Sequence, residues 1–216
     1  MDVEISSCKK CGNCCEKGGP ALHIPDLKSI KNGNIPISSL ITIRKGELVH
    51  NPLVDRIKAT TVELVKLVGT GRTWDCCYYK PGTGCTIYEH RPHACRVLKC
   101  WDTGEILALV EKDTLDRFAI LEKDDPLIPI IREHERICPC DGLEFIQANR
   151  TTLSANKKAE IEKIIRLDLR FRSRVINDFG LKLNEEMFYF GRPIFQLLSP
   201  FGVHIYESGD DIHVKW

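Results

Sequence analysis

The longest stretch of regular hydrophobic spacing lies in the last third of the chain. Ile161, Ile165 and Leu169 recur every four residues within the segment 154–180. This spacing places apolar side chains on one face of a helix. Gly180 follows the periodic residues and is typical of a helix end, because glycine readily adopts the left-handed conformation. The pattern therefore predicts a long amphipathic helix that ends at Gly180.

Alternating apolar and polar residues predict short strands elsewhere. The segments concerned are 39–50, 62–69, 74–88 and 203–216. The first has a turn signal at Lys45-Gly46, and the third has aromatic residues on both sides of Pro81-Gly82, so it predicts a hairpin. The last segment alternates around residues 208–211 and predicts a terminal hairpin.

Shorter helices are predicted from start signals followed by apolar residues. They cover residues 91–100, 113–123, 126–137 and 185–190. Pro92 suits the first turn of the first helix, because proline already has a helical φ angle. Asp113 or Thr114 is a candidate cap for the second helix, and Asn184 for the last.

Composition limits the class of protein. The chain has 216 residues, 43% of them hydrophobic, which is enough for a genuine core. Its 31 basic and 30 acidic residues give a net charge of +1, so charge provides no general reason to bind nucleic acid or a membrane surface. No apolar run is long enough to span a bilayer, and the N-terminal residues lack a secretory signal pattern. We therefore expect a cytoplasmic protein whose thiols stay reduced.

The cysteines change this picture most. All eleven lie between Cys8 and Cys140, which predicts a cysteine-bearing domain over residues 1–145 and a helix-and-hairpin segment over 146–216. The expected fold class is α+β, with a small irregular domain organised around metal. Cys8, Cys11 and Cys14 are spaced C-x2-C-x2-C, and in a reducing compartment such spacing favours metal binding over disulfides.

The kind of metal stays open at this point. Iron–sulfur is slightly favoured over zinc, because three cysteines in one C-x2-C-x2-C run are similar to a ferredoxin motif. Zinc is the close alternative, although separated cysteine pairs and histidine ligands are more typical of it. The role of Cys15, which directly follows Cys14, also stays open. It is a further ligand of the same metal, a ligand of a second metal or iron, or a reactive thiol.

Two motifs together resemble a known family. CKKCGNCC and the distant CTIYEHRPHACR resemble the CxxCxxCC cysteine-cluster proteins, also called the YkgJ family, a zinc- or iron-chelating domain. The resemblance covers residues 8–142 and implies about eight metal-ligating cysteines. The candidates are Cys8, Cys11, Cys14, Cys15, Cys76, Cys85, Cys95, Cys138 and Cys140. Cys76 is preferred to Cys77 because it lies two residues after Trp74, and Cys138 and Cys140 compete for the last position.

Three functions follow as hypotheses. The first is a metal-binding protein with an iron–sulfur cluster or Zn²⁺ in a redox or structural role. The second is a metal-dependent protein (lysine) methyltransferase-like enzyme, since flagellin lysine N-methylases resemble this domain. The third is an interaction module whose fold is held together by zinc and whose C-terminal helix contacts a protein partner. Lys163, Arg166, Arg170 and Arg174 form a basic stripe on that helix, which we interpret as a solvated face.

Overall fold

A computed structural model describes residues 7–208 and 211–216, and it has the α+β class that the sequence predicts. The helices are α1 Leu27–Lys31, α2 His93–Val97, α3 Gly104–Ala108, α4 Arg117–Ile120, α5 Leu127–Ile137, α6 Leu143–Asn149, α7 Ala155–Phe179, α8 Leu183–Phe190 and α9 Ile194–Leu198. The strands are β1 Leu40–Ile43, β2 Leu48–Asn51, β3 Arg56–Ala59, β4 Leu64–Leu67, β5 Gly69–Thr70, β6 Asp75–Cys76, β7 Tyr79–Lys80, β8 Gly84–Cys85, β9 His204–Ser208 and β10 Asp211–Lys215.

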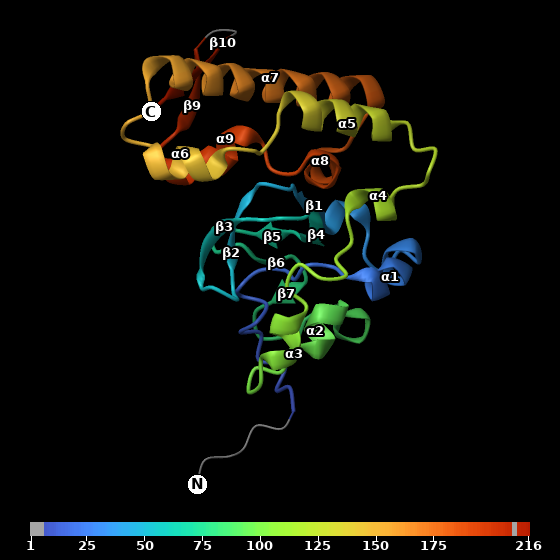
Figure 1. Ribbon diagram of the computed structural model, residues 1–216. Coiled ribbons are helices and arrows are strands. Elements are labelled where there is room, and N and C mark those ends of the chain that lie inside the picture. The colour runs from blue at the N-terminus through green and yellow to red at the C-terminus, as the bar shows by residue number, and fades with distance from the viewer. Residues whose placement is uncertain (1–6, 209–210) are drawn as a thin grey trace.

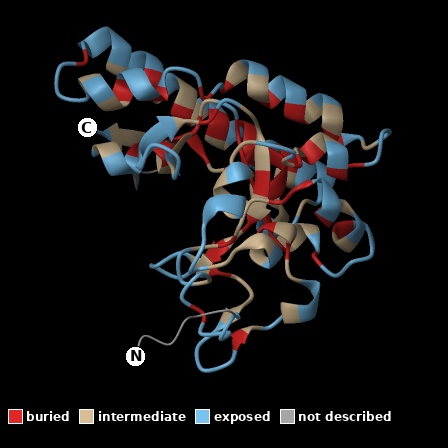
Figure 2. Cartoon of the chain, turned by 60° about the horizontal axis from the view of Figure 1, so that its bottom comes forward, coloured by how far each residue is buried: buried red, intermediate tan, exposed pale blue. Residues whose placement is uncertain are grey.

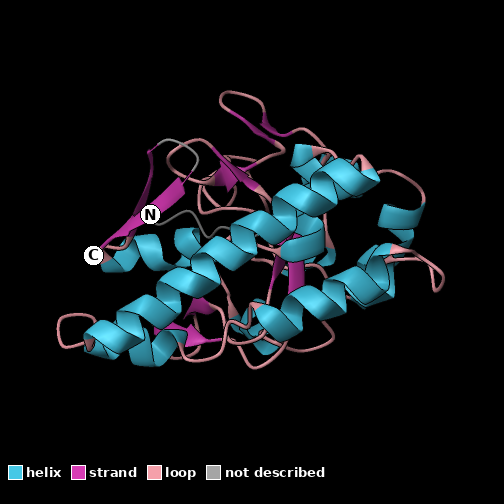
Figure 3. Ribbon diagram, turned by 90° about the horizontal axis from the view of Figure 1, so that it is seen from above, coloured by secondary structure: helices cyan, strands magenta, loops and turns pink. Residues whose placement is uncertain are grey.

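The elements form three zones along the molecule (Figure 1). The longer helices α5 and α7 lie with α6, α8, α9 and the β9–β10 hairpin at one end, and the strands β1 to β7 lie below them. The short helices α2 and α3 lie at the other end, beside the N-terminal cysteine segment. Viewed from above, α7 crosses the molecule with α5 beside it (Figure 3), and these two helices pack against each other. The chain thus separates its cysteine-rich end from its helical end.

All strands pair antiparallel and in twos. β1 and β2 flank the turn at Lys45-Gly46 as predicted, but they do not pair with each other. Instead β1 pairs with β4, placing Leu40 opposite Leu67, and β2 pairs with β3. The hairpin around Pro81-Gly82 is confirmed by the pairing of β7 with β8.

The terminal hairpin is confirmed by the pairing of β9 with β10, although Gly209 and Asp210 of its turn lie outside the described residues. The long helix α7 also matches its prediction. Ser154 Oγ accepts a hydrogen bond from Lys157 N at 3.3 Å, and Gly180 ends the helix with φ 61°. Both are the expected devices for satisfying the free backbone groups at helix ends.

Two predicted caps are wrong. Neither Asp113 nor Thr114 caps α4, because the helix begins later and Asp116 Oδ1 accepts from Ala119 N at 2.7 Å. Asn184 lies inside the first turn of α8, where Lys182 holds the cap position. Both segments offer more than one polar residue near the start, and sequence pattern does not choose between them.

Two clusters of buried apolar residues hold the fold together (Figure 2). The first core includes Leu22, Leu40, Val65, Ile131, Phe171, Val175, Phe188 and Phe190. The second core includes Leu143, Ile146, Ile161, Ile165, Ile194, Leu198 and Val203. Helices α7 and α8, which follow residue 145, therefore complete the first core. Independent folding of 1–145 and 146–216 remains a prediction.

In the part of the chain that the structure describes, no helix combines the length and the apolar character needed to cross a membrane.

Candidate metal centre

The first cysteine motif lies against the hairpin formed by β7 and β8. Gly12 has φ 89°, and a Cβ atom there would overlap the ring of Tyr79. A Cβ atom at Gly84 would lie 2.8 Å from the carbonyl oxygen of Lys10. Glycine at both positions therefore lets the motif approach the hairpin closely. Cys76 N donates to the carbonyl of Cys15 at 2.9 Å, which joins the motif to β6.

A tight turn shapes the second half of the motif. Cys15 N and Glu16 N both donate to the carbonyl of Gly12, at 2.7 Å and 3.1 Å. In such a turn neighbouring side chains do not point to opposite faces as they do in a strand. The thiols of Cys14 and Cys15 consequently interact, and Cys14 contributes to raising the pKa of Cys15 to about 12, after burial as the larger cause.

Five thiols from three separate segments line one cavity of the protein. Burial raises the pKa of the Cys95 thiol most, and the charges of Cys76, Cys14, Cys15 and Cys85 raise it further, in that order. Electrostatic effects of this kind require the groups to be near one another in a poorly solvated place. We call these residues, Cys14, Cys15, Cys76, Cys85 and Cys95, the thiol group. A cation among them would relieve the repulsion between their thiolates.

Cys76 is the member of the thiol group best suited to ionise. Its side chain is buried, yet its pKa is lowered to about 7. A hydrogen bond from the Cys77 thiol is the largest cause, and the backbone of Tyr78 and the charge of Lys66 also lower it against the effect of burial. Cys77 also lies 4.0 Å from the carbonyl oxygen of Ser39. The structure thus gives Cys77 a supporting position beside Cys76.

Cys8 and Cys11 are exposed, as Cys14 is. The Cys8 sulfur accepts from Lys10 N at 3.4 Å, and hydrogen bonding to Cys8 is the largest cause of the raised pKa of Tyr88. Arg91 covers the same Tyr88 ring, with Cζ 3.8 Å from the ring centroid. Arg91 also donates to the Tyr88 carbonyl at 2.7 Å. The CTIYEHRP motif therefore builds a stacked support next to Cys85.

A buried carboxylate positions Cys95. Asp26 is fully buried, and its Oδ1 accepts from His93 N at 2.7 Å at the start of α2. Its Oδ2 accepts from His23 N at 2.9 Å, and Arg96 Nη2 lies 3.7 Å from Oδ1. Asp26 thus fixes the helix that carries Cys95. It lies 67 residues before His93 in the sequence, and an isolated Asp gave no signal of this role.

Cys138 and Cys140 are placed elsewhere. Both are buried, and burial raises the pKa of each to about 12. The charges of Arg44, Asp168 and Glu135 act on both cysteines. Arg172 also acts on Cys138, and Glu47 also acts on Cys140. No member of the thiol group is among these charges. Arg44 Nη1 donates to the carbonyl of Cys138 at 2.8 Å. The structure does not bring these cysteines to the thiol group, and metal binding by them remains a prediction.

A second set of potential ligands surrounds Cys138. The ligand atoms of His134, Cys138 and Asp168 all lie within 4.8 Å of one another. Asp168 Oδ1 already accepts from His134 and, at 2.7 Å, from Arg172 Nε, while its Oδ2 accepts from Ile194 N at 2.8 Å. A cation here would face the buried guanidinium of Arg172. We therefore assign this set to a hydrogen-bonded network that joins the helices. Sequence reasoning missed His134 and Asp168.

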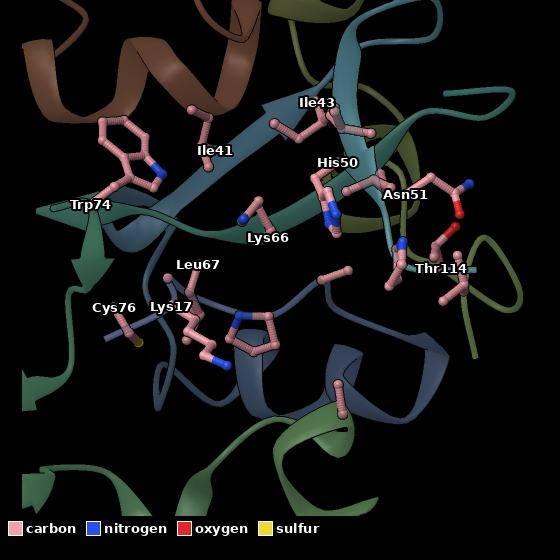
Figure 4. A pocket seen from close by; sticks show the side chains of 18 of the residues that line it. Lys17, Ile41, Ile43, His50, Asn51, Lys66, Leu67, Trp74, Cys76 and Thr114 are labelled. Atoms are coloured by element: carbon pink, nitrogen blue, oxygen red, sulfur yellow. The ribbon is translucent and has the colours of Figure 1, made fainter. Parts of the chain in front are cut away.

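A large cavity opens beside the thiol group. Its volume is about 880 Å³, and all five members of the group contribute to its wall. Figure 4 shows Cys76 with Lys66, Ile41 and Ile43 around this space. A small molecule bound in the cavity can therefore contact the thiol group.

Comparison with known proteins gives one match. No curated protein and no solved structure is similar to the chain. A family model, CxxCxxCC, described as a putative zinc- or iron-chelating domain, matches residues 7–118. This range contains both cysteine motifs and the whole thiol group, and it ends before Cys138. The chain therefore belongs to the CxxCxxCC family of zinc- or iron-chelating domains.

Proposed function

We propose that this protein holds an iron–sulfur cluster in its thiol group. The observation that carries the proposal is that Cys14, Cys15, Cys76, Cys85 and Cys95, from three separate segments, line the same cavity. Thiolates are the usual ligands of such clusters. Cys14 ends a C-x2-C-x2-C run whose other members are Cys8 and Cys11, and such a run is typical of cluster-binding proteins. The buried position of Cys76 and the ordered support around Cys85 suit either a redox or a structural role.

The experiment is metal analysis of protein purified without oxygen, with an absorption spectrum of the same sample. Iron with acid-labile sulfide supports the proposal. Zinc without sulfide, in colourless protein, contradicts the cluster but keeps metal chelation, and it favours a zinc-stapled interaction module. Protein that takes up neither metal contradicts the chelating role altogether.

The ligand assignment has its own test. Cys11→Ser removes a motif cysteine, whereas Cys100→Ser removes an exposed cysteine outside both motifs. We expect Cys11→Ser to lower the metal content more than Cys100→Ser does. Equal losses would contradict the assignment of the first motif to the centre.

A methyltransferase-like enzyme is the second candidate, and the cavity beside the thiol group is the observation that favours it. An enzyme needs space for a substrate next to its reactive centre, and this cavity lies within the size range of small-molecule sites. Saturable binding of S-adenosylmethionine by the metal-loaded protein would support this candidate, and its failure to bind would exclude that reaction.

A further inference from the structure

The cavity joins the two ends of the molecule. One wall comes from the cysteine segments, and another comes from β1, β2 and β4. Leu197 and Phe201, which follow the region matched by the family model, close it from the helical side. The cavity is therefore built by this chain as a whole, and its shape depends on residues outside the family domain.

Most of the wall is apolar. Representative residues are Ile41, Ile43, Leu67, Leu98, Val110 and Phe201. A space of about 880 Å³ lined in this way favours an apolar occupant, because burying each additional CH₂ group contributes about 0.8 kcal/mol. A small polar substrate would leave most of this wall without a matching contact.

Two lysine ammonium groups in the wall, those of Lys17 and Lys66, have no carboxylate partner among the described residues. Lys66 projects from β4 near Cys76 (Figure 4), and among the described residues no carboxylate lies within 4.0 Å of its ammonium. Glu47 is the carboxylate whose charge acts on Lys66, but it already pairs with Arg192, whose Nε donates to it at 2.7 Å. Glu111, also in the wall, accepts hydrogen bonds from Thr61. The balance of charge inside the cavity thus favours an anion.

The electrostatic state of Lys66 agrees with this reading. Burial lowers the pKa of Lys66, and the charge of Arg192 lowers it further, against smaller opposing effects of Cys76 and Glu47. The Cys76 thiolate is the larger favourable charge that the protein supplies, and a bound carboxylate would stabilise the charged ammonium further. The ammonium and the apolar wall together specify an amphipathic ligand.

We propose that the cavity binds a small carboxylic acid with an unbranched apolar chain, its carboxylate at Lys66 and its chain along the wall of Ile43 and Leu98. The carboxylate end then lies next to Cys76. This deepens the proposed function, and the placement of the ligand beside a metal rests on that function. The contacts to the ligand come from protein side chains, and binding needs no bond to the metal.

The test is calorimetric titration of decanoate, decanol and decylammonium into the full chain, both metal-loaded and after metal removal. We expect decanoate to bind at least about tenfold more tightly than decanol, since a charge-assisted hydrogen bond contributes about 1.5–3 kcal/mol. Decylammonium should bind most weakly. Equal affinity for all three, or no binding of decanoate to either form, would overturn the proposal.

Three variants separate the causes. Lys66→Met should weaken the binding of decanoate at least about tenfold and leave the affinity for decanol unchanged, because methionine keeps the apolar stem and removes the charge. Val110→Trp fills the cavity from a partly exposed position outside both cores and should weaken both ligands. Lys28→Met, on the exposed face of α1, is the matched control and should change neither.

The outcomes also distinguish the two proposals. Decanoate bound by protein that holds no iron would sustain the cavity proposal and contradict the iron–sulfur proposal. An intact iron centre with unchanged decanoate affinity in Lys66→Met would overturn the cavity proposal alone. In that case Lys66 would serve as a counter-ion for the metal-bound thiolates, visible as a changed absorption spectrum of the variant.

Discussion

His134 Nε2 lies 2.6 Å from Asp168 Oδ1, and neither side chain is exposed. Because a carboxylate only accepts hydrogen bonds, Nε2 carries the proton and donates it. Nδ1 of His134 has no partner among the described residues. The contact joins α5 to α7, and Arg172 extends it by donating to the carbonyls of Phe190 and Gly191 at 2.9 Å each. One buried network thus fixes three helices.

This network predicts loss of stability in acid. Burial lowers the pKa of His134 below its ordinary 6.5, although Asp168 partly opposes the shift. In the unfolded chain His134 therefore binds a proton near pH 6.5, whereas in the folded chain it does so only at lower pH. Stability contributed by neutral His134 is present above pH 6.5 and falls as the pH drops below it. Urea unfolding at pH 7.5 and pH 5.5 measures this difference.

His134→Gln is the control for the pH effect, because glutamine can donate to Asp168 but does not titrate. Its stability should fall less between pH 7.5 and pH 5.5 than that of the unchanged protein. Identical pH profiles would show that His134 does not contribute. A separate loss is expected at lower pH, since hydrogen bonding to His134 and the charge of Arg172 outweigh burial and lower the pKa of Asp168 from 3.8 to about 2.

The buried partner of Asp168 should matter more than any surface pair. Arg172→Met leaves Asp168 and Glu186 without their guanidinium, and breaking a buried pair typically costs about 3–5 kcal/mol. Arg136→Met breaks an exposed pair with Glu133 and should cost at most about 1 kcal/mol. Denaturant unfolding measures both. Similar losses would show that the network contributes little to stability.

Gly12→Ala should disturb metal binding through the motif's contact with the hairpin. An added Cβ overlaps Tyr79, whose hydroxyl donates to Glu16 Oε1 at 2.6 Å. Gly33→Ala is a matched control, because Gly33 also has positive φ but no atom within 4 Å of the added Cβ. Both changes strain the backbone, by about 1 kcal/mol. Only Gly12→Ala should reduce metal per chain, and equal metal content would contradict the role of this contact.

Metal removal should loosen one end of the molecule and leave the other intact. Cys76 lies in the first core and Cys15 packs against it, but α7 also packs in the second core, which contains no member of the thiol group. Hydrogen exchange after chelation should therefore rise in residues 8–19 and 76–100 and change little in α7. Faster exchange throughout α7 would show instead that the metal stabilises the whole fold.

Local patterns in the sequence predicted the elements that depend on local spacing. The helix α7, the hairpin of β7 and β8, and the terminal hairpin all follow from periodicity and turn residues. The pairing of β1 with β4 was not predictable in this way, because it joins segments more than twenty residues apart. The strand β3 was missed, since Arg56–Ala59 has only four residues and is largely exposed.

The candidate site was only partly predictable for a related reason. The first motif and the family resemblance together identified Cys14, Cys15, Cys76, Cys85 and Cys95, but sequence could not show that Cys138 and Cys140 lie with Arg44. A signal for the buried network did exist in α7. Residues 161, 165, 168, 172 and 175 form one stripe at helical spacing, and Asp168 and Arg172 are the polar residues on it. Charged residues on an apolar stripe indicate a buried pair.

The central claim is that cysteines from three segments form one metal centre apart from Cys138. The most direct measurement is iron, zinc and labile sulfide per chain in the unchanged protein, Cys95→Ser and Cys138→Ser, all purified without oxygen. We predict that Cys95→Ser loses most of its metal, whereas Cys138→Ser keeps the content of the unchanged protein. Full metal in Cys95→Ser, or a loss in Cys138→Ser as large as in Cys95→Ser, would contradict the account.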